Sequence, residues 1–94
     1  MTFNLGDHIN MSGNWNFPNS ATGVVAKYPQ YVTDACGEEG SKDGFTRQVR
    51  GKNGPVTFVW IKFDEPQMDS DGDGPYREGE VELEFVSHIE CGAI

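Results

Sequence analysis

The chain has 94 residues, twelve glycines, five prolines and a formal net charge of −8. Its length supports one hydrophobic core, because a chain of this size buries roughly 60–65% of the surface that its unfolded form exposes. The N-terminal segment lacks the basic start and apolar run of a secretory signal or anchor, and no stretch approaches the ~20 apolar residues of a membrane span. We therefore expect one cytoplasmic domain over residues 1–94.

The negative charge is concentrated in one segment. Between Asp64 and Glu84, nine acidic residues stand against one basic residue, Arg77, so the segment carries a charge of −8 (1 − 9). The rest of the chain has six acidic and six basic residues and sums to zero. Such a field repels phosphates and anionic lipid and attracts cations. We expect basic protein partners, and neither nucleic acid nor membrane.

The first part of the chain predicts two strands joined by a loop. Residues 7–11 predict the first strand, and residues 22–28 (TGVVAKY) predict a second strand that a proline closes. The segment between them is rich in the turn-forming residues Asn, Ser, Gly and Pro. It also contains Trp15 and Phe17, two large apolar side chains.

Residues 29–54 predict an extended loop. The segments CGEEG, SKDG and GKNG interrupt any regular pattern there. A loop of this length is unusual in so small a domain and tends to be functional or mobile. Within it, residues 45–50 (FTRQVR) alternate enough to predict a short strand.

Residues 55–64 (PVTFVWIKFD) predict the strongest strand of the chain. Apolar residues fall on both of its faces, which is typical of a central strand. An acidic hairpin loop is expected at residues 64–79. Residues 80–90 then alternate glutamate with apolar residues and favour a strand, with a helix as the alternative, and a bend is expected near residues 85–88. The pattern predicts an all-β fold, a small barrel of about five strands.

The order of these segments resembles the Src-homology-3-like (SH3-like) small barrels. Gly6-Asp7 precedes the first strand, Thr22-Gly23-Val24-Val25 opens the second, Phe63-Asp64-Glu65-Pro66 ends the third and Glu80-Val81-Glu82-Leu83 forms the fourth. The resemblance implies a five-stranded SH3-like barrel with a long insertion loop, residues 29–54, between the second and third main strands. The FDEPQ, DGDGPY and EVE segments also resemble uncharacterised small bacterial proteins, which implies no known activity.

Aromatic residues around the first loop are the candidate partner site. SH3-like barrels that bind peptides use aromatic side chains on the loop after the first strand, so the resemblance implies an exposed groove here. The alternative is that Trp15 and Phe17 fold back to cap the core. The candidate groove residues are Trp15, Phe17, Pro18, Tyr28 and Tyr31.

Residues 69–80 (DSDGDGPYREGE) match the calcium-loop pattern D-x-[DN]-x-[DN]-G-x5-E. The flanks differ from an EF-hand, because the incoming segment is β-branched and aromatic and is stopped by a proline. The alternative is an exposed hairpin loop, which also favours Asp and Gly. The candidate calcium ligands are Asp69, Asp71, Asp73, the carbonyl of Pro75, and Glu80.

The remaining reactive residues predict no catalytic site. Cys36 and Cys91 are far apart and are expected to be reduced thiols, with a single long-range disulfide as the alternative. His8 and His88 lie near the two ends, where a barrel can bring them together. No serine elbow, phosphate-binding glycine loop or zinc spacing is present.

Two hypotheses for function follow from these residues. The first is a non-enzymatic binding module that meets a protein partner, or a second copy of the chain, with its acidic face (residues 64–84) and aromatic loop (residues 15–18). The second is a calcium-stabilised domain, which differs from the first in its dependence on metal. If the chain dimerises, an edge strand near residues 45–50 or 80–85 is the expected seam.

Overall fold

The longest strand, β4 (Gly54–Gln67), organises the sheet. Along one edge it pairs with β3 (Thr46–Gly51) in its first half and with β2 (Ala21–Val25) in its second half. Along the other edge it pairs with β5 (Tyr76–Glu82). The prediction that this segment is the central strand is confirmed.

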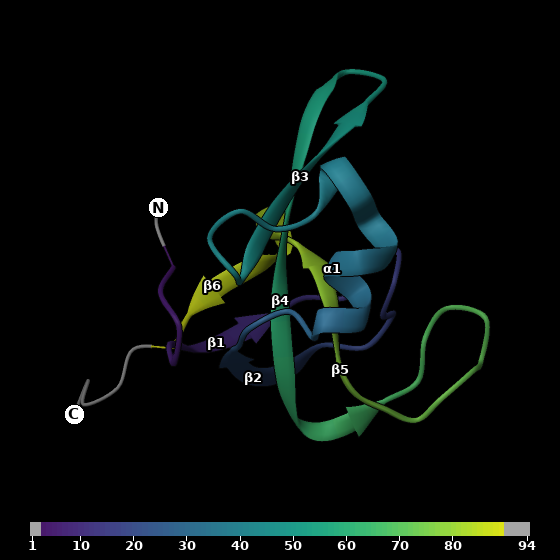
Figure 1. Ribbon diagram of the computed structural model, residues 1–94. Coiled ribbons are helices and arrows are strands. Elements are labelled where there is room, and N and C mark those ends of the chain that lie inside the picture. The colour runs from purple at the N-terminus through teal and green to yellow at the C-terminus, as the bar shows by residue number, and fades with distance from the viewer. Residues whose placement is uncertain (1–2, 90–94) are drawn as a thin grey trace.

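The computed structural model describes residues 3–89 and shows a curled antiparallel sheet that forms a half-barrel (Figure 1). The sheet has six strands in the order β3-β4-β2-β1-β6, and β5 pairs with β4 beside this path. The remaining two strands are β1 (His8–Met11) and β6 (Val86–His88). The prediction of an all-β barrel of about five strands is confirmed in its predominance of strands, whereas the structure has six strands, two short helical segments of 3-10 type and one α-helix, and forms a half-barrel.

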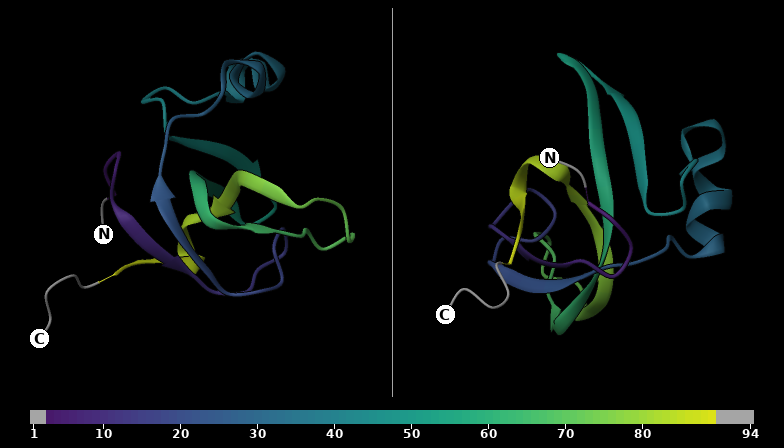
Figure 2. Two further views of the ribbon diagram at one scale, coloured as in Figure 1. Left: turned by 90° about the horizontal axis from the view of Figure 1, so that it is seen from below. Right: turned by 90° about the vertical axis from the view of Figure 1, so that its left-hand side faces the viewer.

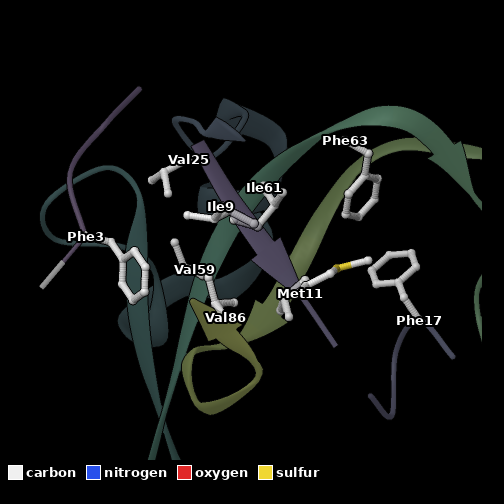
Figure 3. Packing of buried hydrophobic residues seen from close by; sticks show 10 residues of the cluster. Phe3, Ile9, Met11, Phe17, Val25, Val59, Ile61, Phe63 and Val86 are labelled. Carbon is white, nitrogen blue, oxygen red and sulfur yellow. The ribbon is translucent and has the colours of Figure 1, made fainter. Parts of the chain in front are cut away.

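The concave face of the half-barrel holds the core (Figure 3). Val59 and Ile61 of β4 point into it and have no exposed surface. Each such side chain stabilises the fold by roughly 1.5–3 kcal/mol through removal of apolar surface from water. Figure 3 also shows the side chain of Met11 pointing toward the ring of Phe17, so the aromatic loop contributes to the core.

The other face of β4 is covered as well, as the alternation of its residues predicts. Trp60 lies on this outer face and is only 6% exposed. The ring of Tyr28, the residue that follows the second strand by three positions, lies 5.0 Å from it, centroid to centroid. The outer face therefore carries a second, smaller layer that positions the candidate site.

A short helix corrects the prediction of an extended loop at residues 29–54. The helix α1 (Gln30–Cys36) and a 3-10 turn, η1 (Gly37–Glu39), lie beside the sheet, and β3 follows them (Figure 2). The helix has seven residues and buries none of them, so it shows no apolar stripe in the sequence. The strand expected at residues 45–50 is confirmed by β3.

The C-terminal strand predicted over residues 80–90 is broken in the structure. β5 begins earlier, at Tyr76, and a 3-10 turn, η2 (Leu83–Phe85), separates it from β6. This turn is the expected bend, placed a few residues earlier than predicted. Because β4 extends to Gln67, the acidic hairpin loop is confined to residues 68–75 rather than 64–79.

Further expectations concern edges, thiols and membranes. Among the described strands, β3 and β5 each pair with β4 alone, so the two segments expected at sheet edges do lie there. Cys36 ends α1, while Cys91 lies outside the described residues. Within residues 3–89, no helix combines the length and the apolar character that crossing a membrane requires.

Candidate functional site

Three segments that are distant in sequence enclose one groove on the outer face of the sheet. They are the loop between β1 and β2, the start of α1, and the β4–β5 hairpin. The groove has a volume of about 350 Å³. Its aromatic lining is Trp15, Phe17, Tyr31, Trp60 and Tyr76, and its acidic lining is Asp69, Asp71, Glu78 and Glu80.

Exposed aromatic side chains are concentrated at this groove. Trp15 is 81% exposed, Tyr31 is 72% exposed and Tyr76 is 42% exposed. Only two other large apolar side chains of the described residues are comparably exposed, Leu5 and Met68, and neither lines the groove. A larger hollow of about 590 Å³ beside Phe3 and Leu83 contains no residue of this exposed set. An exposed apolar patch rimmed by polar groups is typical of an interaction site.

The loop that carries Trp15 is held by hydrogen bonds on both sides. The side-chain oxygen of Asn14 accepts hydrogen bonds from the backbone N–H groups of Asn16 and Phe17, each at 3.0 Å. The backbone N–H of Ser70 donates to the carbonyl of Asn16 at 3.0 Å, and the Ser70 hydroxyl donates to the carbonyl of Trp15. Trp15 is therefore presented to solvent from a fixed turn against the acidic hairpin.

Glu80 is engaged inside the molecule. Its Oε2 accepts from Arg47 Nε at 2.6 Å and from the Tyr28 hydroxyl at 2.8 Å, and its Oε1 accepts from Arg47 Nη2 at 2.8 Å. Burial, followed by the hydrogen bond to Glu80, raises the pKa of Tyr28 above its usual value. The hydrogen bonds to Glu80 raise the pKa of Arg47. The charge of Glu80 is thus compensated by Arg47, which lies on β3 on the far side of β4.

Glu78 occupies the floor of the same groove in a different way. Its Oε1 accepts a hydrogen bond from the indole Nε1 of Trp60 at 2.8 Å. Alternate residues of a strand point to opposite faces. Since Gly79 of β5 is buried on the inner face, its neighbour Glu78 points to the outer face. An indole N–H therefore orients this carboxylate beside exposed aromatic rings.

The acidic loop folds around Asp69. Its Oδ1 accepts from the backbone N–H groups of Asp71 at 3.0 Å and Asp73 at 2.9 Å. The carboxylates of these three residues offer ligand atoms within 4.8 Å of one another. Their negative charge, above all that of Asp69, raises the pKa of the adjacent Tyr76. Pro75 lies on the exposed part of this loop, and Glu80 is directed to Arg47 instead.

Of the five predicted groove residues, the structure brings three together. Trp15, Phe17 and Tyr31 line the groove, with Phe17 only 6% exposed and therefore serving both the core and the wall. Tyr28 lies behind the groove against Trp60 and Glu80, and Pro18 is exposed outside the lining. Within the aromatic loop, Phe17 thus packs inward and Trp15 faces solvent.

Among the aromatic lining residues, sequence reasoning missed two, Trp60 and Tyr76, as members of the groove. The alternation of residues 55–64 places Trp60 on the face opposite the core, which is the signal that it lines a second surface. Tyr76 follows the acidic loop, and only the register of the hairpin, which pairs Gln67 with Tyr76, brings it to the groove. No local pattern in the sequence encodes that register.

The two histidines form separate pairs away from the groove. His8 Nε2 lies 2.9 Å from Asp64 Oδ2, which also accepts from the Thr22 hydroxyl at 2.6 Å. His88 Nε2 lies 3.1 Å from Asp7 Oδ2. The backbone N–H of Asn4, and then His88, lower the pKa of Asp7, whereas the Thr22 hydroxyl, and then His8, lower the pKa of Asp64. The first pair joins β1 to β4 across β2, and the second joins β6 to the residue before β1, so the two histidines have separate partners.

Comparison with known proteins identifies no relative. The chain matches no protein-family model, no curated protein and no solved structure.

Proposed function

We propose that this chain is a non-enzymatic binding module whose groove holds a basic, extended segment of a partner protein. The observation that carries the proposal is the coincidence, in one groove, of the most exposed aromatic side chains with four carboxylates. The aromatic loop and the acidic face, which are far apart in the sequence, meet there.

The chemistry of the lining supports a cationic ligand. The face of an aromatic ring attracts Lys and Arg side chains, and carboxylates add charge complementarity. Among residues 3–89, no Lys, Arg or His lines the groove. Arg47 binds Glu80 through two nitrogens and donates through its third to the carbonyl of Glu39, so it does not compete for the other carboxylates.

Titration with a short basic peptide tests the proposal. The chain has two tryptophans, Trp15 and Trp60, and both line the groove, so intrinsic fluorescence reports binding there directly. We expect a Lys/Arg-rich peptide to change this fluorescence and an acidic peptide of equal length to leave it unchanged. Raising the salt concentration should weaken binding, because exposed charges are screened.

Two variants separate the groove from the rest of the surface. Tyr31→Ala should weaken binding about tenfold, since it removes one aromatic wall. Leu5→Ala is the matched control, because Leu5 is exposed and lies outside the groove. Equal affinities for these two variants, or no response of the wild-type protein to the basic peptide, would contradict the proposal.

We also propose an SH3-like arrangement for the half-barrel and a cytoplasmic location. The support for the fold is the strand order along the chain, with the aromatic loop after β1 and the acidic hairpin after β4. A second copy of the chain is the alternative partner, and the edge strand β3 is then the expected seam. Size-exclusion chromatography over a range of concentrations tests self-association.

A second candidate function is calcium binding by the acidic loop. The convergence of the Asp69, Asp71 and Asp73 carboxylates favours it, since calcium prefers oxygen ligands. Calcium should then raise the melting temperature of the metal-stripped protein by several degrees, with magnesium as the control. Asp71→Ala should abolish this rise and Glu80→Gln should retain it, because Glu80 binds Arg47. An unchanged melting temperature would exclude this candidate.

A further inference from the structure

The carboxylates that line the groove differ in what already binds them. Both oxygens of Glu80 are occupied by Arg47 and Tyr28. Asp69 accepts two backbone N–H groups of its own loop. Glu78 accepts the Trp60 indole N–H through one oxygen, and no ion pair found among residues 3–89 involves it.

The surroundings of Glu78 hold its carboxylate in one orientation. Trp60, its hydrogen-bond donor, is 6% exposed and packs against the ring of Tyr28. The indole therefore has little freedom to move, and the hydrogen bond leaves Oε2 of Glu78 available. The carboxylate is partly shielded from water, which strengthens its attraction for a cation.

We propose that Glu78 is the specificity-determining residue of the groove and binds the guanidinium of one arginine in the partner segment. Exposed rings of the groove, Trp15 and Tyr31, provide surfaces on which a planar guanidinium stacks. Arginine fits this combination better than lysine, because its guanidinium stacks on aromatic rings and donates to a carboxylate at the same time. This inference rests on the proposed function and names the ligand group within it.

Nuclear magnetic resonance of the two indole N–H groups tests the inference. The probes are a tetra-arginine and a tetra-lysine peptide with acetylated and amidated ends. We expect the arginine peptide to shift both indole signals, and to bind several-fold more tightly than the lysine peptide. Glu78→Gln should weaken the arginine peptide about tenfold, as removal of one charged hydrogen-bonding partner does.

Glu84→Gln is the matched control for charge. Glu84 is exposed and lies outside the groove, so this variant removes the same charge and should change the affinity less than twofold. Glu78→Asp keeps the charge, but its side chain is shorter by one methylene group, so the carboxylate lies farther from the ligand. This variant should also weaken binding several-fold. Dispersed amide signals in each variant establish that it is folded.

The possible failures are distinguishable. If Glu78→Gln binds as the wild type does while Tyr31→Ala loses affinity, the groove is correct and the role of Glu78 is wrong. Equal affinities for the arginine and lysine peptides would refute the preference for a guanidinium. If neither peptide shifts the indole signals of the wild-type protein, the proposed function itself is wrong.

Discussion

The guanidinium of Arg47 reaches over β4 to the carboxylate of Glu80 and binds it at two points. Nε lies 2.6 Å from Oε2, Nη2 lies 2.8 Å from Oε1, and the side chains are 16% and 18% exposed. The Arg47 Cζ atom lies 5.6 Å from the centre of the Phe58 ring, which is on β4 between the two flanking strands. The pair thus fastens β3 to β5 on the outer face of the sheet.

The first prediction concerns this ion pair. Glu80→Gln keeps the size of the side chain but leaves Arg47 largely buried without its counter-charge, so we expect a loss of about 2 kcal/mol in the free energy of unfolding. Urea unfolding measures it. Glu84→Gln, an exposed residue with the same charge change, should lose less than ~0.5 kcal/mol. Equal losses for both variants would show that the pair contributes no specific stability.

A second prediction concerns the loss of stability at alkaline pH that the raised pKa of Tyr28 causes. Its folded pKa is raised above the usual value of 10.0, so the folded state holds this proton where the unfolded state has lost it. The contribution is fully present below about pH 10 and is lost as the pH rises from there toward the folded pKa. Above pH 10 the free energy of unfolding should therefore fall more steeply for the wild type than for Tyr28→Phe. Parallel slopes in urea titrations would contradict this origin of the shift.

The third prediction concerns the acid limit of stability. The Thr22 hydroxyl, and then His8, lower the pKa of Asp64 below its usual value of 3.8. Stability from this shift is present above about pH 4 and is lost as the pH falls through the folded pKa. Asp64→Asn should flatten the fall in stability below pH 4, whereas Glu65→Gln, its exposed neighbour, should leave the slope of the wild type. Urea unfolding between about pH 5 and pH 2 distinguishes the two.

Local alternation explains how much of the fold is readable in the sequence. Residues 55–64 carry apolar side chains on both faces, and this pattern correctly predicts a central strand covered on both sides. By contrast, α1 buries no residue and has no apolar stripe, so only the absence of Gly and Pro over residues 30–36 indicates it. The spacing of apolar residues reflects which side chains are buried, so it does not reveal an element that buries none.

The candidate site depends on pairings that no short segment contains. The acidic and aromatic residues are recognisable as types, but their meeting requires the register of β5 on β4, which opposes Trp60 to Glu80. Likewise, the calcium-loop pattern counts Glu80 as its twelfth position and contains no information about Arg47, 33 residues away. The residue types of the site are therefore predictable from the sequence, whereas their partners follow only from the sheet.

The last prediction concerns Gly79, which lies beneath the wall of the groove. A Cβ atom at this position would lie 2.6 Å from Cζ and 2.9 Å from Cε2 of Phe17. The Phe17 ring is confined on another side by Phe63, at 4.9 Å between ring centres, and so cannot withdraw without disturbing the core. We expect Gly79→Ala to lower the free energy of unfolding by about 1–3 kcal/mol, as overpacking does.

A second substitution shows whether this contact is the cause. Phe17→Leu shortens the opposing side chain, so Gly79→Ala should be less destabilising in that background than in the wild type, and a double-mutant cycle measured by urea unfolding gives the coupling. If the two effects simply add, the ring does not lie against Gly79. In that case the loop carrying Trp15 packs on β5 through other contacts, and different residues would line the groove. If the two effects are coupled, the absence of a side chain at Gly79 is what allows the aromatic loop to pack closely against β5. A larger residue there would push the aromatic residues of the groove away from its acidic residues.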